Sequence, residues 1–182
     1  MRRQRWILWT CGFAIACLAL ALKGVWASAD SDDGTRWDVT VRNVSHIYRP
    51  HVRTSAHEDC NFLRGTGAVR HCAPAAGADV AYSTLCAAFP LLLTALGLAL
   101  ACAAVTAFSS RPPGNSVAAL AGAALSASFG GTMLAVIAIP RSLAGLEGLS
   151  LQFGGVAYNA AWLGVGLLAI AAILSTASAL RG

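Results

Sequence analysis

The sequence predicts a membrane protein built as a bundle of four transmembrane helices with a small extracellular antiparallel β-sheet. Of the 182 residues, 57% are apolar and only 12% are charged, about half the charged share of a soluble globular chain. Between residues 80 and 180 the only charges are Arg111, Arg141 and Glu147. Four apolar segments are long enough to cross a bilayer. This composition excludes a soluble enzyme and a disordered chain.

The four predicted spans are residues 6–27, 80–108, 117–139 and 153–174. A helix needs about 20 residues to cross a hydrocarbon core of about 30 Å, because each residue adds about 1.5 Å and all backbone groups are bonded internally. Lys23 interrupts the first span near its outer boundary, and Pro140 with Arg141 ends the third. We expect Pro90 to kink or locally break the second span.

Arginine placement predicts that both termini are cytoplasmic. Positive residues in short flanks are retained inside, and in this arrangement only Arg141 lies in a short outer loop. The arginines inside are Arg2, Arg3, Arg5, Arg111 and Arg181. The cytoplasmic segments are then 1–5, 109–116 and 175–182, and the extracellular segments are 28–79 and 140–152. We expect a multi-pass protein of the plasma membrane that contacts anionic inner-leaflet lipid and no nucleic acid.

The first span has an alternative interpretation as a secretory signal peptide. Residues 1–5 form a basic n-region, an apolar stretch follows, and Ala27-Ser28-Ala29 matches a cleavage pattern. The apolar stretch is longer than the usual h-region of about 7 to 15 residues, which favours a retained span. Cleavage would leave three spans and would keep residues 30–79 outside.

The outer segment 28–79 contains the patterns of a small sheet. Trp37, Val39 and Val41 alternate with polar residues, which is typical of a half-buried strand. Gly65-Thr66-Gly67 is suited to a hairpin turn. Cys60 and Cys72 lie at equal distances from Thr66, so such a hairpin sets them opposite each other, about 4.5 to 5.5 Å apart at Cβ.

This register predicts a disulfide between Cys60 and Cys72, because thiols outside the cell oxidise. The bridge would stabilise the segment by about 3 kcal/mol. The alternative is a loop with two free thiols. The remaining cysteines are predicted to be packing residues within the spans, although Cys11 and Cys102 lie towards the inner leaflet and are alternative palmitoylation sites.

The outer segment also contains the chain's one N-x-S/T sequon and all of its histidines. Asn43-Val44-Ser45 predicts N-glycosylation at Asn43. The histidines show none of the spacings typical of zinc sites. We therefore predict solvated histidines, no metal and no cofactor. The histidines are His46, His51, His57 and His71.

The third span carries small residues at every fourth position: Ala118, Gly122, Ser126 and Gly130. Small side chains let another helix backbone approach closely in lipid, so this stripe is a candidate helix-packing face. The second, third and fourth spans hold no ionisable residue at membrane depth. That pattern argues against ion-coupled transport and against hydrolysis within the membrane, and we predict no catalytic residue.

Several features occur together in this chain: the four-span topology, Cys60 followed by Thr66-Gly67 and Cys72, Trp37 opening a strand, and Gly155-Val156-Ala157-Tyr158 with Trp162. In these features the chain resembles the claudin and peripheral myelin protein superfamily of four-span membrane proteins. The resemblance implies a claudin-like α+β fold with a bridged first outer loop. The chain has Ala56-His57-Glu58-Asp59 where claudins have Gly-Leu-Trp, and trypanosomatid amastins are a more distant likeness.

Three functions follow as hypotheses. The first is a non-enzymatic surface protein whose outer sheet contacts other membrane proteins, a neighbouring cell or a second copy. The second is an auxiliary subunit of a channel or receptor that docks through the third span. The third is a membrane thiol oxidoreductase, which the sequence disfavours because it contains no C-x-x-C pair.

Overall fold

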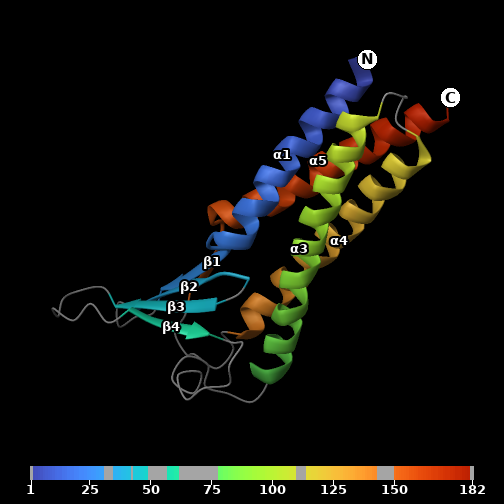
Figure 1. Cartoon of the computed structure of the whole chain (residues 1–182). Helices are drawn as coiled ribbons and strands as arrows, with labels where there is room; N and C mark the ends of the chain where they lie inside the picture. The colour runs from blue at the N-terminus through green and yellow to red at the C-terminus, as the bar shows by residue number, and fades with distance from the viewer. Residues whose placement is uncertain are drawn as a thin grey trace. The chain divides into compact units, whose positions relative to one another are not determined.

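The computed structural model describes residues 2–30, 35–41, 43–48, 57–61, 78–109, 114–142 and 150–180. Within these ranges the chain forms long helices and short strands (Figure 1). The helices are α1 (Arg2–Lys23), α3 (Ala78–Phe108), α4 (Asn115–Ser142) and α5 (Val156–Ala179). The strands are β1 (Ala27–Asp30), β2 (Thr35–Val39), β3 (Asn43–Tyr48), β4 (His57–Asn61) and β5 (Ser150–Phe153).

All four helices are long and apolar enough to cross a membrane. Their qualifying segments are Gln4–Lys23, Ala87–Phe108, Asn115–Pro140 and Val156–Ala179. Within the described ranges, the number of candidate spans and their order therefore agree with the prediction. A small antiparallel sheet accompanies them, as predicted.

The ends of the helices differ from the predicted spans. α1 ends at Lys23, before the predicted boundary at residue 27, and Ala27 instead lies in β1, where it pairs with strands on both sides. α4 continues through Pro140 to Ser142, and α3 runs through Pro90 without a break. A proline removes one backbone donor, which a long helix tolerates when its other bonds persist.

The chain divides into two compact units. The first contains Met1–Leu20, Pro90–Thr132 and Ala160–Gly182, and the second contains Ala21–Phe89 and Met133–Asn159. The core of the first unit is a cluster of fully buried side chains from all four helices: Ile7, Cys11, Cys102, Val117, Ala121 and Ala171. Most are small, which allows helix backbones to approach closely.

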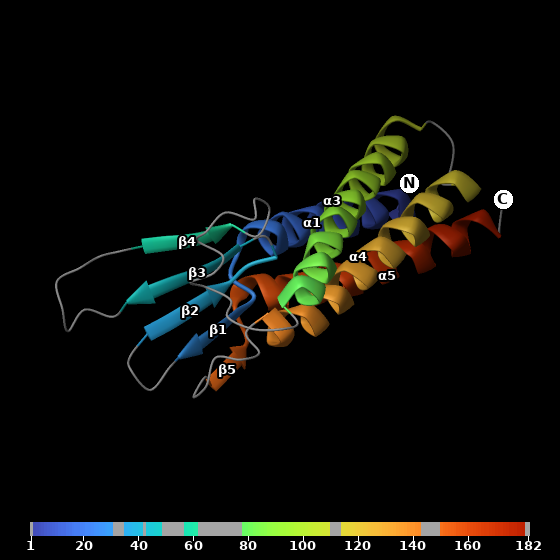
Figure 2. The same ribbon diagram turned by 90° about the horizontal axis from the view of Figure 1, so that it is seen from below.

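The sheet belongs to the second unit and has the order β4-β3-β2-β1-β5, with every neighbouring pair antiparallel (Figure 2). The predicted alternating strand is present as β2. β5 was not predicted: Phe153 was assigned to the fourth span, whereas it pairs with Ala27. The predicted hairpin between residues 60 and 72 lies mostly outside the described residues.

Among the described residues, Trp26 has the largest fully buried side chain, and it lies just before β1. Its backbone N–H donates to the Val39 carbonyl at 2.8 Å, and its indole Nε1–H donates to the Ala21 carbonyl at 2.6 Å. The edge of its ring faces Tyr158, with ring centroids 6.4 Å apart. Through its backbone and its indole, Trp26 therefore joins the end of α1, strand β2 and the start of α5.

Candidate functional site

The predicted helix-packing stripe is only partly occupied by the chain itself. Ala118, Gly122 and Gly130 are half-buried and Ser126 is exposed, with its hydroxyl donating to the Gly122 carbonyl at 3.0 Å. A Cβ at Gly122 would have no described atom within 4 Å, whereas one at Gly130 would meet Leu91 Cδ1 at 3.9 Å. The middle of the stripe is therefore open for contact, and its docking role stays a prediction.

Among the described glycines of the first unit, Gly164 on α5 packs most closely against a neighbouring helix. A Cβ there would meet Cys17 Cβ at 3.4 Å and Leu18 Cγ at 3.6 Å, both on α1. Nearby, Phe129 of α4 and Trp162 of α5 meet edge to face with centroids 6.3 Å apart. These contacts show α5 packed against both α1 and α4.

Two buried hydroxyl groups on α4 were missed by the sequence reasoning. Ser128 and Thr132 are fully buried, and neither hydroxyl oxygen has a hydrogen-bond partner among the described residues. They lie four positions apart and so share a face of the helix. Serine and threonine in an alanine-rich span give no sequence signal that separates a buried hydroxyl from a lipid-facing one.

Two cysteines distant in sequence meet in the core of the first unit. The Cys11 thiol donates to Cys102 Sγ at 3.7 Å, and the Cys102 thiol donates to the Val117 carbonyl at 3.8 Å. The thiols thus link α1, α3 and α4. Both side chains are fully buried and free, which favours the predicted packing role over palmitoylation.

Gln4 makes a second connection between α1 and α3. Its side-chain Nε2 donates to the Thr106 carbonyl at 2.6 Å and to the Ser109 carbonyl at 3.2 Å. These acceptors lie at the end of α3, where the last carbonyls lack a partner within the helix. The first turn of α1 therefore caps the end of α3.

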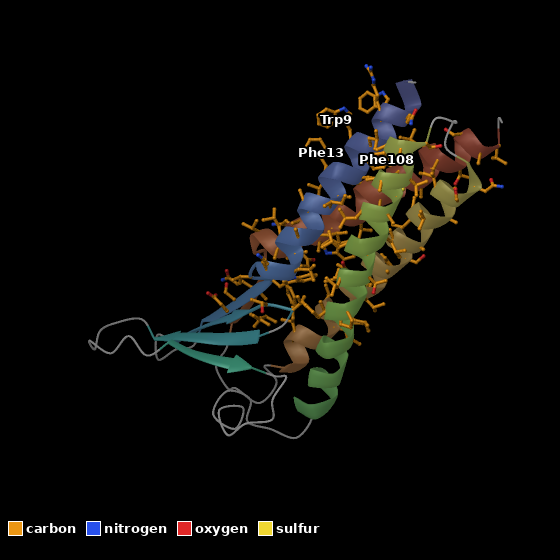
Figure 3. All side chains as sticks on the ribbon, in the orientation of Figure 1. Trp9, Phe13 and Phe108 are labelled. Carbon is orange, nitrogen blue, oxygen red and sulfur yellow. The ribbon has the colours of Figure 1, made fainter. Side chains whose placement is uncertain are left out.

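The most exposed apolar surface near the N-terminus is an aromatic face of α1. Trp6, Trp9 and Phe13 are 60%, 64% and 58% exposed. Together with Arg5 they line an open groove of about 400 Å³. The rings of Trp9 and Phe13 stack with centroids 5.9 Å apart, and Figure 3 shows both projecting away from the other helices of the unit. From the sequence, these residues were predicted only as part of an apolar span.

The described strands carry two of the predicted outer-segment residues. Asn43 is the first residue of β3 and lies opposite Asn61 of β4 in the register. Cys60 lies in β4 opposite Val44, whereas Cys72 lies outside the described residues. Glycosylation and the disulfide stay predictions. His46 and His57 occupy strand positions, and the described residues contain no group of three potential metal ligands.

The chain was compared with models of protein families and with curated proteins. No family model matches it, and no curated protein matches it.

Proposed function

We propose that the chain is a non-enzymatic, claudin-like membrane protein with four spans that makes protein–protein or cell-surface contacts through the sheet formed largely by residues 28–79. The observation that carries the proposal is the pairing of β1 with β5. β1 follows the first candidate span and β5 precedes the fourth. Two candidate spans, α3 and α4, separate them, so a four-span topology returns the chain to the same side of the membrane.

The surface of the first unit supports lipid as its solvent. Large apolar side chains from all four helices are about half exposed or more, including Leu93, Leu100, Leu163 and Ile170. Soluble monomers seldom expose contiguous apolar patches of more than a few hundred square ångströms. A hydrocarbon environment removes that cost and leaves the helices associated through small residues.

The contacts of α1 support a retained first span rather than a cleaved signal peptide. Ile7 and Cys11 belong to the buried core, and Gln4 bonds two carbonyls of α3. Cleavage after residue 29 would remove all three side chains and also Trp26. Both termini are proposed to be cytoplasmic because of the flanking arginines.

Protease protection on intact cells tests this topology. Protease added outside is expected to cut within residues 28–79, while tags at both termini remain protected until the cells are permeabilised. A glycosidase-sensitive shift that is lost in Asn43→Gln would mark the same segment as extracellular. Cutting of either terminal tag on intact cells, or release of the chain from membranes by alkaline carbonate, would refute the proposal.

A second candidate function is that of an auxiliary subunit that docks through α4. The open surface at Gly122 and the exposed Ser126 favour it. Replacing both residues with leucine is expected to abolish co-purification with a membrane partner without reducing surface delivery. Gly97→Leu on α3 is a matched control, because a Cβ there also has no described atom within 4 Å. Equal co-purification of the double variant would exclude docking at this face.

A further inference from the structure

We propose that the groove formed by Arg5, Trp6, Trp9 and Phe13 on α1 is a binding site for one anionic phospholipid. The inference rests on the proposed membrane placement and adds a defined ligand to it. The groove has a volume of about 400 Å³, with a guanidinium group at one end and three exposed aromatic side chains along the rest. This arrangement matches a molecule that has one anionic end and a long apolar part.

The dimensions of the groove agree with a lipid lying along the helix. From Arg5 to Phe13 the helix rises about 12 Å, at about 1.5 Å per residue. One leaflet of the hydrocarbon core is about 15 Å thick, half of the full ~30 Å. A phosphate bonded to Arg5 at the interface would therefore place its acyl chain beside Trp9 and Phe13. Tryptophan is enriched at the interface, the level of Arg5 and the adjacent Trp6, because its ring is apolar and its N–H is polar.

The charge of the surrounding unit favours an anionic ligand over a zwitterionic one. All eight acidic residues of the chain lie at positions 30–79 and 147, so the unit that contains Arg5 has none. Its cations are the five arginines at positions 2, 3, 5, 111 and 181. No acidic side chain of this unit competes with a phosphate for the Arg5 guanidinium, which bonds phosphate oxygens in a bidentate manner.

The aromatic residues are available because they are not used in the core. Ile7 and Cys11, on the opposite side of α1, fill that role. Trp9 and Phe13 stack on each other, and this arrangement forms a continuous apolar wall. A second copy of the chain is a less suitable occupant, because it would bring another acid-free, arginine-bearing unit against Arg5.

Quenching of Trp9 by brominated lipids tests the site. The protein is reconstituted into vesicles of phosphatidylcholine with one fifth phosphatidylglycerol, and either lipid carries the bromine. The quenching of Trp9 is obtained as the difference in fluorescence quenching between the native chain and the Trp9→Phe variant. Per mole of brominated lipid, we expect phosphatidylglycerol to quench Trp9 about fivefold more than phosphatidylcholine, which corresponds to about 1 kcal/mol for one arginine near an anionic lipid.

Two variants with the same loss of charge separate a site from general surface attraction. Arg5→Gln is expected to abolish the preference for phosphatidylglycerol, and because Arg5 is exposed the fold should be retained. Arg3→Gln is the control, since position 3 lies about 200° of helical rotation from position 5. The preference should persist in Arg3→Gln. Equal loss in both variants, or no preference in the native chain, would overturn the proposal.

Two further outcomes distinguish the failure of this site from the failure of the membrane proposal. If the other tryptophans are quenched but Trp9 is not, a protein surface covers the groove and the lipid site is wrong. If no tryptophan is quenched by either brominated lipid, the chain is not in the bilayer and the proposed function also fails.

Discussion

Replacing Gly155 with alanine tests the junction between the sheet and α5. Gly155 immediately precedes α5, and its carbonyl accepts the Asn159 backbone N–H at 3.2 Å. A Cβ at this position would overlap the Val25 carbonyl group, and rotation cannot move a Cβ away. The Val25 backbone has little room to yield. The next residue, Trp26, donates to Val39, and β1 is paired on both sides.

The substitution is expected to lower the free energy of unfolding by about 2–4 kcal/mol. Separating Val25 from position 155 pulls β5 away from β1, which it matches over four residue pairs. Two or three lost hydrogen bonds at about 0.5–1.5 kcal/mol each give about 1–4 kcal/mol. Overpacking at other sites costs about 1–3 kcal/mol. For a chain of this length, the expected decrease in Tm is about 4–16 °C.

Gly166→Ala is the matched control because a Cβ at Gly166, inside α5, would have no described atom within 4 Å. This variant should change the stability by no more than about 1 kcal/mol, in the stabilising direction, since alanine is the better helix former. Thermal unfolding in bicelles, followed by tryptophan fluorescence, measures both variants. A Gly155→Ala protein as stable as Gly166→Ala would refute the proposed junction between β1 and the start of α5.

Three other substitutions probe the core, each measured by unfolding in detergent mixtures. Trp26→Phe is expected to lower the unfolding free energy by about 2–3 kcal/mol, because it removes the indole donor to Ala21 and shrinks a fully buried ring. Unchanged stability would contradict a stabilising role of the Trp26 indole. Thr132→Val should raise the unfolding free energy by about 1–2 kcal/mol, because the buried hydroxyl has no partner among the described residues. Destabilisation by this substitution would show that the hydroxyl is hydrogen-bonded. Gln4→Leu should lower the unfolding free energy by about 1–2 kcal/mol, because the Thr106 and Ser109 carbonyls lose their donor. Unchanged stability would show that water replaces the Gln4 side chain as the donor.

The helices and one strand could be predicted from the sequence because each depends on local composition. Long apolar segments predicted α1, α3, α4 and α5, and alternation predicted β2. The boundaries were less accurate where apolar residues serve the sheet. Ala27 and Phe153 are as apolar as their helical neighbours, yet they face each other across β1 and β5. That pairing joins residues more than 120 positions apart, and neither segment indicates its partner.

The buried face of α4 shows why a period of four is an imprecise guide to packing. The predicted stripe runs from Ala118 to Gly130 in steps of four, and each step rotates about 40° beyond a full turn. Over three steps the stripe therefore winds partly around the helix, and Ser126 becomes exposed. The fully buried positions instead follow steps of four, three and four, which keep to one face: Val117, Ala121, Ala124 and Ser128.

The choice between a signal peptide and a retained span could not be made from composition, because both are apolar helices that follow basic residues. Tertiary contacts of α1 favour the retained span. A signal peptide leaves the mature protein, so its side chains have no lasting partners there, whereas Cys11 contacts Cys102 and Gln4 bonds the end of α3. Without α1, the core of the first unit would lose Ile7 and Cys11, and Leu18 would no longer lie beside Gly164. This packing favours retention of α1 in the mature protein, which stays a prediction.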